Sequence, residues 1–283
     1  MTINENKIKI ASLEWFYREG FPTENNHKTP VILLHGLLSQ SFSWLEIMPI
    51  LTEYGYRAIA PDWLGWGLSD IPDKRDFDYT PSAYLTAFAE FIDELKLEKI
   101  SLVVQGFLAT VGIQYALKYP DKIDKLIILN TPIFSTAKLP WQIAQCGIPF
   151  LGDMVTQDPL IVDRTLEKGS GFVISDQNLA FYRKPIVTSS LPGRTLVTVV
   201  KKLQLKQVTA EIEAGLKQWE KLCLIIWGKD DPWLEFSPVE TLVKSNNNLK
   251  LITIEEAKHY PQEHFSKEIS PMIVNFLGSF NNP

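Results

Sequence analysis

The residues that could carry chemistry lie in a few loops, each of which follows a predicted strand. They occur in VILLHGLLSQSFSW (31–44), APDWLGWGLSD (60–70), SLVVQGFLATVGIQYA (101–116), LIIWGKDDPWL (224–234) and AKHYPQEHF (257–265). Ligand sites in open α/β sheets form beyond the carboxyl ends of the strands, so we expect these loops to meet at one edge. The last two bring carboxylates and histidines to that edge, and such groups can move protons.

The elements that must position these loops alternate between strands and helices. Short β-branched runs predict strands over residues 7–10, 13–17, 31–35, 57–62, 100–105, 125–130, 222–228 and 249–254. Helical patterns cover residues 81–97, with Thr80 as N-cap and Pro81 at the first helical position, and residues 107–119 and 265–280. This alternation predicts a mostly parallel sheet with helices on both faces.

The alternation stops between about Pro132 and Glu220. That stretch has helical segments separated by LPW, GIPFLGD, KGSGF and SLPGR. We expect a helical cap over residues 133–220, inserted into a core formed by residues 1–132 and 221–283.

Composition excludes several classes of function. The 283 residues carry a net charge of −5, and Lys and Arg are scattered, so nucleic acid is not an expected partner. Neither a signal peptide nor a transmembrane segment is expected. Cys146 and Cys223 are expected to be buried thiols, and together with the missing signals they indicate a cytoplasmic protein. No metal-ligand cluster or nucleotide-binding loop occurs in the sequence, so no metal or cofactor is expected.

Together these motifs resemble the α/β-hydrolase superfamily and, within it, the haloalkane dehalogenases and their close relatives. The resemblance extends from about Ile8 to the last helix. It implies the α/β-hydrolase fold, with an eight-stranded sheet and a cap. In this group a sharp strand–turn–helix carries the nucleophile, and dehalogenases typically have V-V-Q-D-W-G-G there. This chain has Val103-Val104-Gln105-Gly106-Phe107-Leu108-Ala109.

The resemblance therefore places glycine, Gly106, at the nucleophile position. Phe107 replaces a tryptophan that helps to hold halide, and Leu108 replaces a small residue that lets the helix approach the strand. Glycine suits this turn, because the nucleophile normally has a positive φ that strains any residue with a Cβ. It also removes the atom that forms the covalent intermediate, and losing the nucleophile of a triad costs roughly a million-fold in kcat. We therefore expect no hydrolysis through a covalent enzyme intermediate.

The resemblance implies that the acid and the base are retained. Asp231 in GKDDP matches the acid that orients the histidine, with Asp230 the weaker candidate, and His259 matches the base. The order of Gly106, Asp231 and His259 along the chain is the order of the family. With the nucleophile gone, an acid and an imidazole that form only a structural pair are as plausible as a functional pair.

The oxyanion donors implied by the resemblance are backbone N–H groups, those of Leu37 and Phe107. His35 is expected to be a structural residue of this loop, beside the pocket. Substitute nucleophiles would need contact with the base, which disfavours Gln105, Thr110, Tyr260, Ser39 and Ser41. A water held by His259 in the space left by Gly106 is more plausible.

The cap is rich in aromatic and aliphatic residues, and the resemblance implies an apolar pocket over Gly106. We expect Leu108, Trp141 and Phe172 to line it, which favours an apolar small molecule as ligand. If LPWQIAQCGIPFL (139–151) is exposed, the cap would instead suit a protein or a membrane surface.

Three hypotheses follow. The favoured one is a protein without hydrolase activity that binds an apolar molecule or a partner through the inherited pocket. The second is a hydrolase or lyase in which His259 and Asp231 activate water or move protons without a covalent intermediate. The third is a structural or interaction protein whose pocket is filled by Phe107, Leu108 and cap residues.

Overall fold

An eight-stranded sheet forms the centre of the computed structural model, which describes residues 2–23, 28–158 and 160–279. The order across the sheet is β1-β2-β4-β3-β5-β6-β7-β8. Only the β1–β2 and β2–β4 pairs are antiparallel. The strands are β1 (Ile3–Ile10), β2 (Leu13–Gly20), β3 (Val31–Leu34), β4 (Ala58–Pro61), β5 (Ile100–Gln105), β6 (Ile123–Leu129), β7 (Cys223–Gly228) and β8 (Leu249–Ile254). All eight predicted strands are present.

The central strands are apolar on both sides because both faces of the sheet are covered. In β5, Leu102 and Val104 pack into one core cluster and Val103 into the other, as the alternation of side chains along a strand requires. Helices α2 (Pro81–Glu94), α3 (Thr110–Lys118) and α10 (Ser237–Ser245) contribute to the first cluster. The opposite face is covered by α1 (Met48–Glu53) and α12 (Ser266–Gly278).

The helices begin and end where local chemistry allows. In α2 the Thr80 hydroxyl accepts a hydrogen bond from the Ala83 N–H, as expected of an N-cap, and Pro81 is the first helical residue. The helix predicted to begin at Phe107 begins three residues later as α3, because residues 107–109 form the turn after β5. The last predicted helix is α12, and Phe280, its expected end, lies outside the described residues.

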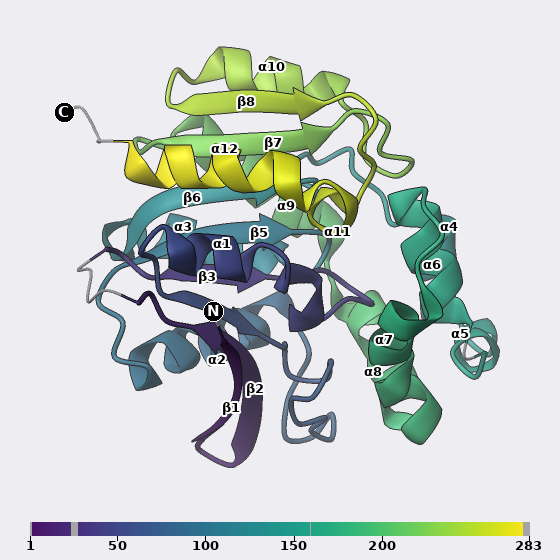
Figure 1. Ribbon diagram of the computed structural model, residues 1–283. Helices are drawn as coiled ribbons and strands as arrows, with labels where there is room; N and C mark the ends of the chain where they lie inside the picture. Colours follow the sequence, from purple (N-terminus) through teal and green to yellow (C-terminus); the bar gives the residue numbers. More distant parts are fainter. Residues whose placement is uncertain (1, 24–27, 159, 280–283) are drawn as a thin grey trace.

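The insertion between β6 and β7 is helical throughout. It contains α4 (Trp141–Ala144), α5 (Leu151–Val155), α6 (Ile161–Ser170), α7 (Asp176–Thr188), α8 (Leu191–Lys202) and α9 (Leu205–Lys217). Figure 1 shows α4–α8 as a group beyond the arrowheads of the parallel strands. Helix α9 does not join this group. It packs against α3 and α10 beside the sheet, although it falls within residues 133–220, the range expected to form the cap. Within the described ranges, no helix is long and apolar enough to cross a bilayer.

Candidate functional site

The turn after β5 carries Gly106 at a positive φ of 85°. It lies against the loop that follows β3, where Gly36 is its neighbour. A Cβ built on Gly106 would lie 2.9 Å from the Gly36 Cα and 3.7 Å from the His259 Nε2. The imidazole therefore faces the position that a side chain at residue 106 would occupy.

A buried acid–imidazole pair stands beside this turn. The Nδ1 of His259 lies 2.8 Å from the Oδ2 of Asp231, and both side chains are at most 1% exposed. The other carboxylate oxygen, Oδ1, accepts hydrogen bonds from the backbone N–H groups of Trp233 (2.8 Å) and Leu234 (3.1 Å). These donors fix the carboxylate, whose contact with Nδ1 orients the ring so that Nε2 faces the turn.

Asn130, the residue after β6, also holds the acid. Its Nδ2 donates to the Asp231 Oδ2 (2.9 Å) and to the Gly228 carbonyl (3.1 Å), and its Oδ1 accepts from the Gly228 N–H (2.8 Å). Its backbone φ is +32°, which asparagine tolerates better than most residues. The sequence analysis overlooked Asn130, although its place directly after a parallel strand was a usable signal.

The backbone of His259 is fixed from two sides. Its N–H donates to the Gly169 carbonyl of α6 (2.9 Å), and its carbonyl accepts from the Gln105 Nε2 (2.7 Å). Gln105 also accepts a hydrogen bond from Gln262. Gln105 therefore positions the imidazole through the backbone, in agreement with the expectation that it is not a nucleophile.

Two buried backbone N–H groups are free to bind a negatively charged oxygen. Leu37 and Phe107 are 2% and 1% exposed, and among the described residues neither N–H has an acceptor. Buried backbone donors are rarely left unpaired, so these two N–H groups are candidate donors to an oxyanion. The N-terminal end of α3, just beyond Phe107, adds a partial positive charge on the same side.

His35 shapes the oxyanion loop, as the sequence predicted. Its Nδ1 lies 2.8 Å from the Gly36 carbonyl, and its Nε2 accepts from the Trp63 N–H at 3.2 Å. Burial lowers the pKa of His35, so its ring is neutral, and both of its ring nitrogens are already occupied. It is therefore not a proton-transfer group.

Comparison with known proteins agrees with this geometry. A family model described as alpha/beta hydrolase fold matches residues 29–146. A cis-3-alkyl-4-alkyloxetan-2-one decarboxylase of Shewanella oneidensis is 29% identical over 266 residues, which is 88% of this chain and 81% of the relative. A haloalkane dehalogenase of Psychrobacter cryohalolentis is 24% identical, over 88% of this chain and 83% of the relative.

Solved structures give the same fold. The crystal structure of haloalkane dehalogenase DbeA from Bradyrhizobium elkani superposes with a TM-score of 0.86, covers 98% of both chains and is 20% identical in sequence. The chain is an α/β-hydrolase-fold protein, similar to haloalkane dehalogenases. Its eight-stranded sheet and helical cap have the architecture that the sequence predicted.

Aromatic side chains enclose the imidazole in this α/β-hydrolase fold. The ring centroids of Phe107, Trp233 and Tyr260 lie 5.3, 4.6 and 4.9 Å from that of His259. Leu108 is also buried, at 1% exposure. The surroundings of the base are thus apolar, which strengthens any polar interaction formed there.

Two hydroxyl groups near the elbow of this α/β-hydrolase fold already have hydrogen-bond partners, whereas the buried Ser39 hydroxyl has none among the described residues. Thr110 donates to the Phe107 carbonyl, and Ser41 accepts a hydrogen bond from Arg18. Burial raises the pKa of the Tyr260 phenol far above its usual value, so this group stays protonated and is a poor nucleophile. Within the described part of the chain, no group of three or more His, Cys, Asp or Glu residues could hold a metal ion.

The structure corrects the placement of two predicted pocket residues. Trp141 is 63% exposed on α4 and lies on the outside of the cap. Phe172 is 42% exposed, and its ring stacks on His264, with centroids 4.3 Å apart. The sequence correctly marked both as apolar cap residues, but it carries no signal for the direction in which a cap helix turns its side chains.

Proposed function

We propose that this chain is an enzyme in which His259 and Asp231 transfer protons on a small, largely apolar carbonyl compound, with no covalent bond to the protein. The relatives with high coverage are named as enzymes, a decarboxylase and dehalogenases, which favours this hypothesis over the binding protein that the sequence alone favoured. The observation that carries the proposal is the orientation of the His259 Nε2, 3.7 Å from the site of a Cβ on Gly106.

The chemistry follows from the positions of the groups. A water molecule between Nε2 and the substrate carbonyl would lose its proton to His259 as its oxygen attacks. The negative charge that develops on the carbonyl oxygen would be stabilised by the N–H groups of Leu37 and Phe107. Asp231 would stabilise the imidazolium, which then returns the proton to the leaving group.

The departures at the elbow argue against haloalkane chemistry. Gly106 supplies no carboxylate to displace a halide, and Phe107 supplies no indole N–H to bind one. Lactones and esters need neither group, because their leaving oxygen accepts a proton. We therefore place the substrate among carboxylic esters or lactones with apolar substituents.

A substrate screen tests the proposal. Wild-type protein, His259→Gln and His264→Gln are assayed on esters, lactones and haloalkanes of graded chain length. His264→Gln is the matched control for His259→Gln, because His264 stacks on Phe172 away from the elbow. We expect ester or lactone turnover that falls by about a hundred-fold or more in His259→Gln, the usual contribution of a general base, and stays near wild type in His264→Gln.

Two results would overturn the proposal. One is turnover that survives the loss of the His259 imidazole. The other is a covalent adduct between substrate and protein, detected by intact-protein mass spectrometry during steady-state turnover. Saturable binding of one of these compounds with no turnover would favour the binding hypothesis instead.

A further inference from the structure

The cap exposes an unusual share of the apolar surface. Of the thirteen large apolar side chains that the described residues expose, ten lie between Trp141 and Leu191. Only Phe21, Tyr54 and Leu68 lie elsewhere. Single exposed apolar residues are normal, but their concentration in one segment marks an interaction surface.

Five of these residues, including Phe150 and Met154, lie at one end of the cap, which we call the cap tip. It is formed by α5 with the loop before it and by the turn between α7 and α8, and it comprises Ile148, Phe150, Met154, Val187 and Leu191. Phe150 is 85% exposed and Met154 is 69% exposed. Figure 1 shows α5 at the outer end of the cap, on the far side from the sheet.

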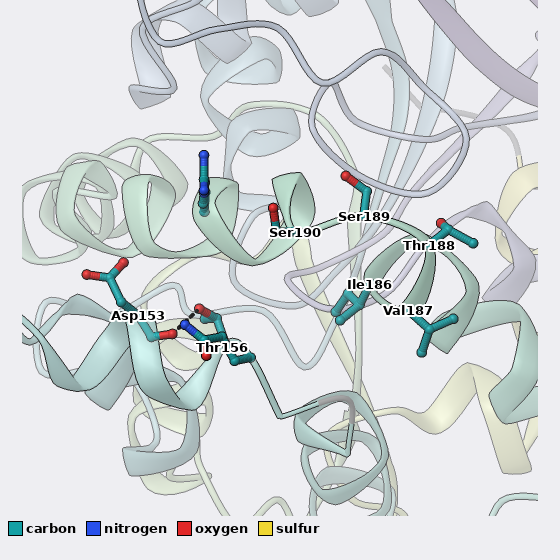
Figure 2. Close-up of a pocket in the computed structure, with 9 residues that line it drawn as sticks. Asp153, Thr156, Ile186, Val187, Thr188, Ser189 and Ser190 are labelled. Atoms are coloured by element: carbon teal, nitrogen blue, oxygen red, sulfur yellow. Dashed lines mark hydrogen bonds between the residues drawn. The ribbon is translucent and has the colours of Figure 1, made fainter.

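A groove joins the two parts of the cap tip. It has a volume of about 730 Å³, and it is lined by Asp153 and Thr156 from one side and by residues 186–190 and Arg194 from the other. Figure 2 shows Asp153 and Thr156 across from the turn between α7 and α8. Of the cap-tip residues, Val187 lines this groove directly, and the groove lies between the two segments that carry the others.

The backbone presents Phe150 to solvent under strain. Its φ is +64°, a conformation that is costly for an aromatic residue. The Phe150 ring is 85% exposed, so burial of the ring does not compensate for this backbone strain. Strain of this kind persists where the exposed position serves a purpose, here the display of an aromatic ring at the end of the molecule.

The charge of the cap differs from that of the core. Residues 133–220 contain ten Lys and Arg against eight Asp and Glu, whereas the rest of the chain contains 18 against 25. Arg194 lines the groove, and Lys184 lies one turn before Val187 on α7. Within the described ranges neither forms an ion pair, so their charge is available to an anionic surface.

We propose that the cap tip docks on an anionic lipid bilayer, with Phe150 and Met154 entering the interface and Arg194 and Lys184 lying near the headgroups. A protruding apolar tip flanked by cations matches the requirements of interfacial binding. This inference does not rest on the proposed enzymatic function.

Co-sedimentation with vesicles tests the proposal. The probes are vesicles of phosphatidylcholine alone and of phosphatidylcholine with phosphatidylglycerol in equal amounts. We expect the protein to bind the anionic vesicles, and the binding to weaken as salt is raised because the cations are screened. Phe150→Ser with Met154→Ser should reduce the bound fraction at least ten-fold, and Arg194→Glu should reduce it as well.

Phe21→Ser is the matched control, since Phe21 is an aromatic side chain, 51% exposed, outside the cap. It should bind as wild type does. Circular dichroism verifies that the cap-tip variants remain folded. The proposal is overturned if the wild-type protein does not bind anionic vesicles, or if the doubly substituted protein binds them as tightly as wild type. A dimer in size-exclusion chromatography with light scattering that is lost in the double variant would assign the tip to self-association instead.

Discussion

Residue 106 is glycine, and the Gly36 backbone closely approaches the position where a Cβ would stand. A Cβ there would approach the Gly36 Cα to 2.9 Å, closer than such atoms normally come. At a φ of 85° it would also strain the turn. The glycine is therefore part of how the two loops meet, as well as the absence of a nucleophile.

We predict that Gly106→Ser lowers the free energy of unfolding by about 1–3 kcal/mol, the usual cost of a residue in a disfavoured backbone region. We also predict that it does not raise ester hydrolysis above wild type, because the loops must move before the hydroxyl can approach His259. Urea unfolding measures the change in stability, and an ester assay measures the change in hydrolysis.

The control for this prediction is Gly278→Ala at the end of α12. An added Cβ there has the Tyr56 hydroxyl, at 3.9 Å, as its nearest neighbour, so stability should not fall. An unchanged unfolding midpoint in Gly106→Ser, or a large gain in hydrolysis, would contradict the prediction and would indicate an elbow still arranged for a nucleophile.

The family resemblance predicted His259, Asp231, Gly106 and the oxyanion loop as site residues, and each of them follows a strand at the same edge of the sheet. Asn130 was equally well placed but was overlooked, since asparagine is not itself a proton-transfer group. Its role becomes visible only from the hydrogen bond to the Asp231 Oδ2, which depends on how β6 and β7 lie together. Contacts between strands that are far apart in the sequence cannot be deduced from a pattern of residue types.

At the scale of elements, the strands were predicted more closely than the helices. Residues 100–105 and 249–254 match β5 and β8 at both ends. Strand β5 is buried along its whole length, whereas β8 lies at the edge of the sheet and is only partly buried. Helix α2 ends at Glu94, before the predicted end at residue 97, and Lys96 follows with a positive φ of 55°. The end of α2 depends on this backbone conformation, which the residue types indicate only weakly.

The N-cap of α2 was predicted from the sequence, and its contribution to stability can be measured. The Thr80 hydroxyl accepts a hydrogen bond from the Ala83 N–H at 3.3 Å, which satisfies one of the free donors of the first turn. We predict that Thr80→Ala lowers the free energy of unfolding by about 0.5–2 kcal/mol. Thr80→Ser keeps the acceptor and should stay within a few tenths of a kcal/mol of wild type. Equal losses in the two variants would show that the cap bond contributes nothing.

At the scale of the whole molecule, the cap and the core are joined by a buried polar contact. The Tyr182 hydroxyl of α7 donates a hydrogen bond to Glu263 of α11 (Pro261–His264), which lies just after the catalytic candidate His259. The pKa of Glu263 is raised to about 7, chiefly by burial, while the hydrogen bond from Tyr182 lowers it and the nearby Glu46 carboxylate raises it. The pKa of Tyr182 is itself raised well above its usual value, chiefly by burial, so its hydroxyl remains a donor.

This contact makes stability depend on pH in a definite direction. In the unfolded chain Glu263 ionises near its ordinary pKa of 4.5, whereas in the folded protein it holds its proton to about pH 7. Between these values the folded state binds more protons, so the Glu263 contribution to the free energy of unfolding falls as pH rises. The loss is on the order of 3 kcal/mol across the window. Above the folded pKa no further loss follows from this group.

We predict that Glu263→Gln flattens this decline, because glutamine keeps the acceptor for Tyr182 but cannot ionise. Urea unfolding of wild type and variant at pH 5 and pH 8 gives the difference, in which groups unaffected by the substitution cancel. The variant should gain stability relative to wild type on going from pH 5 to pH 8. Parallel pH profiles would mean that Glu263 ionises equally in both states, and the contact between cap and core would then be insensitive to pH.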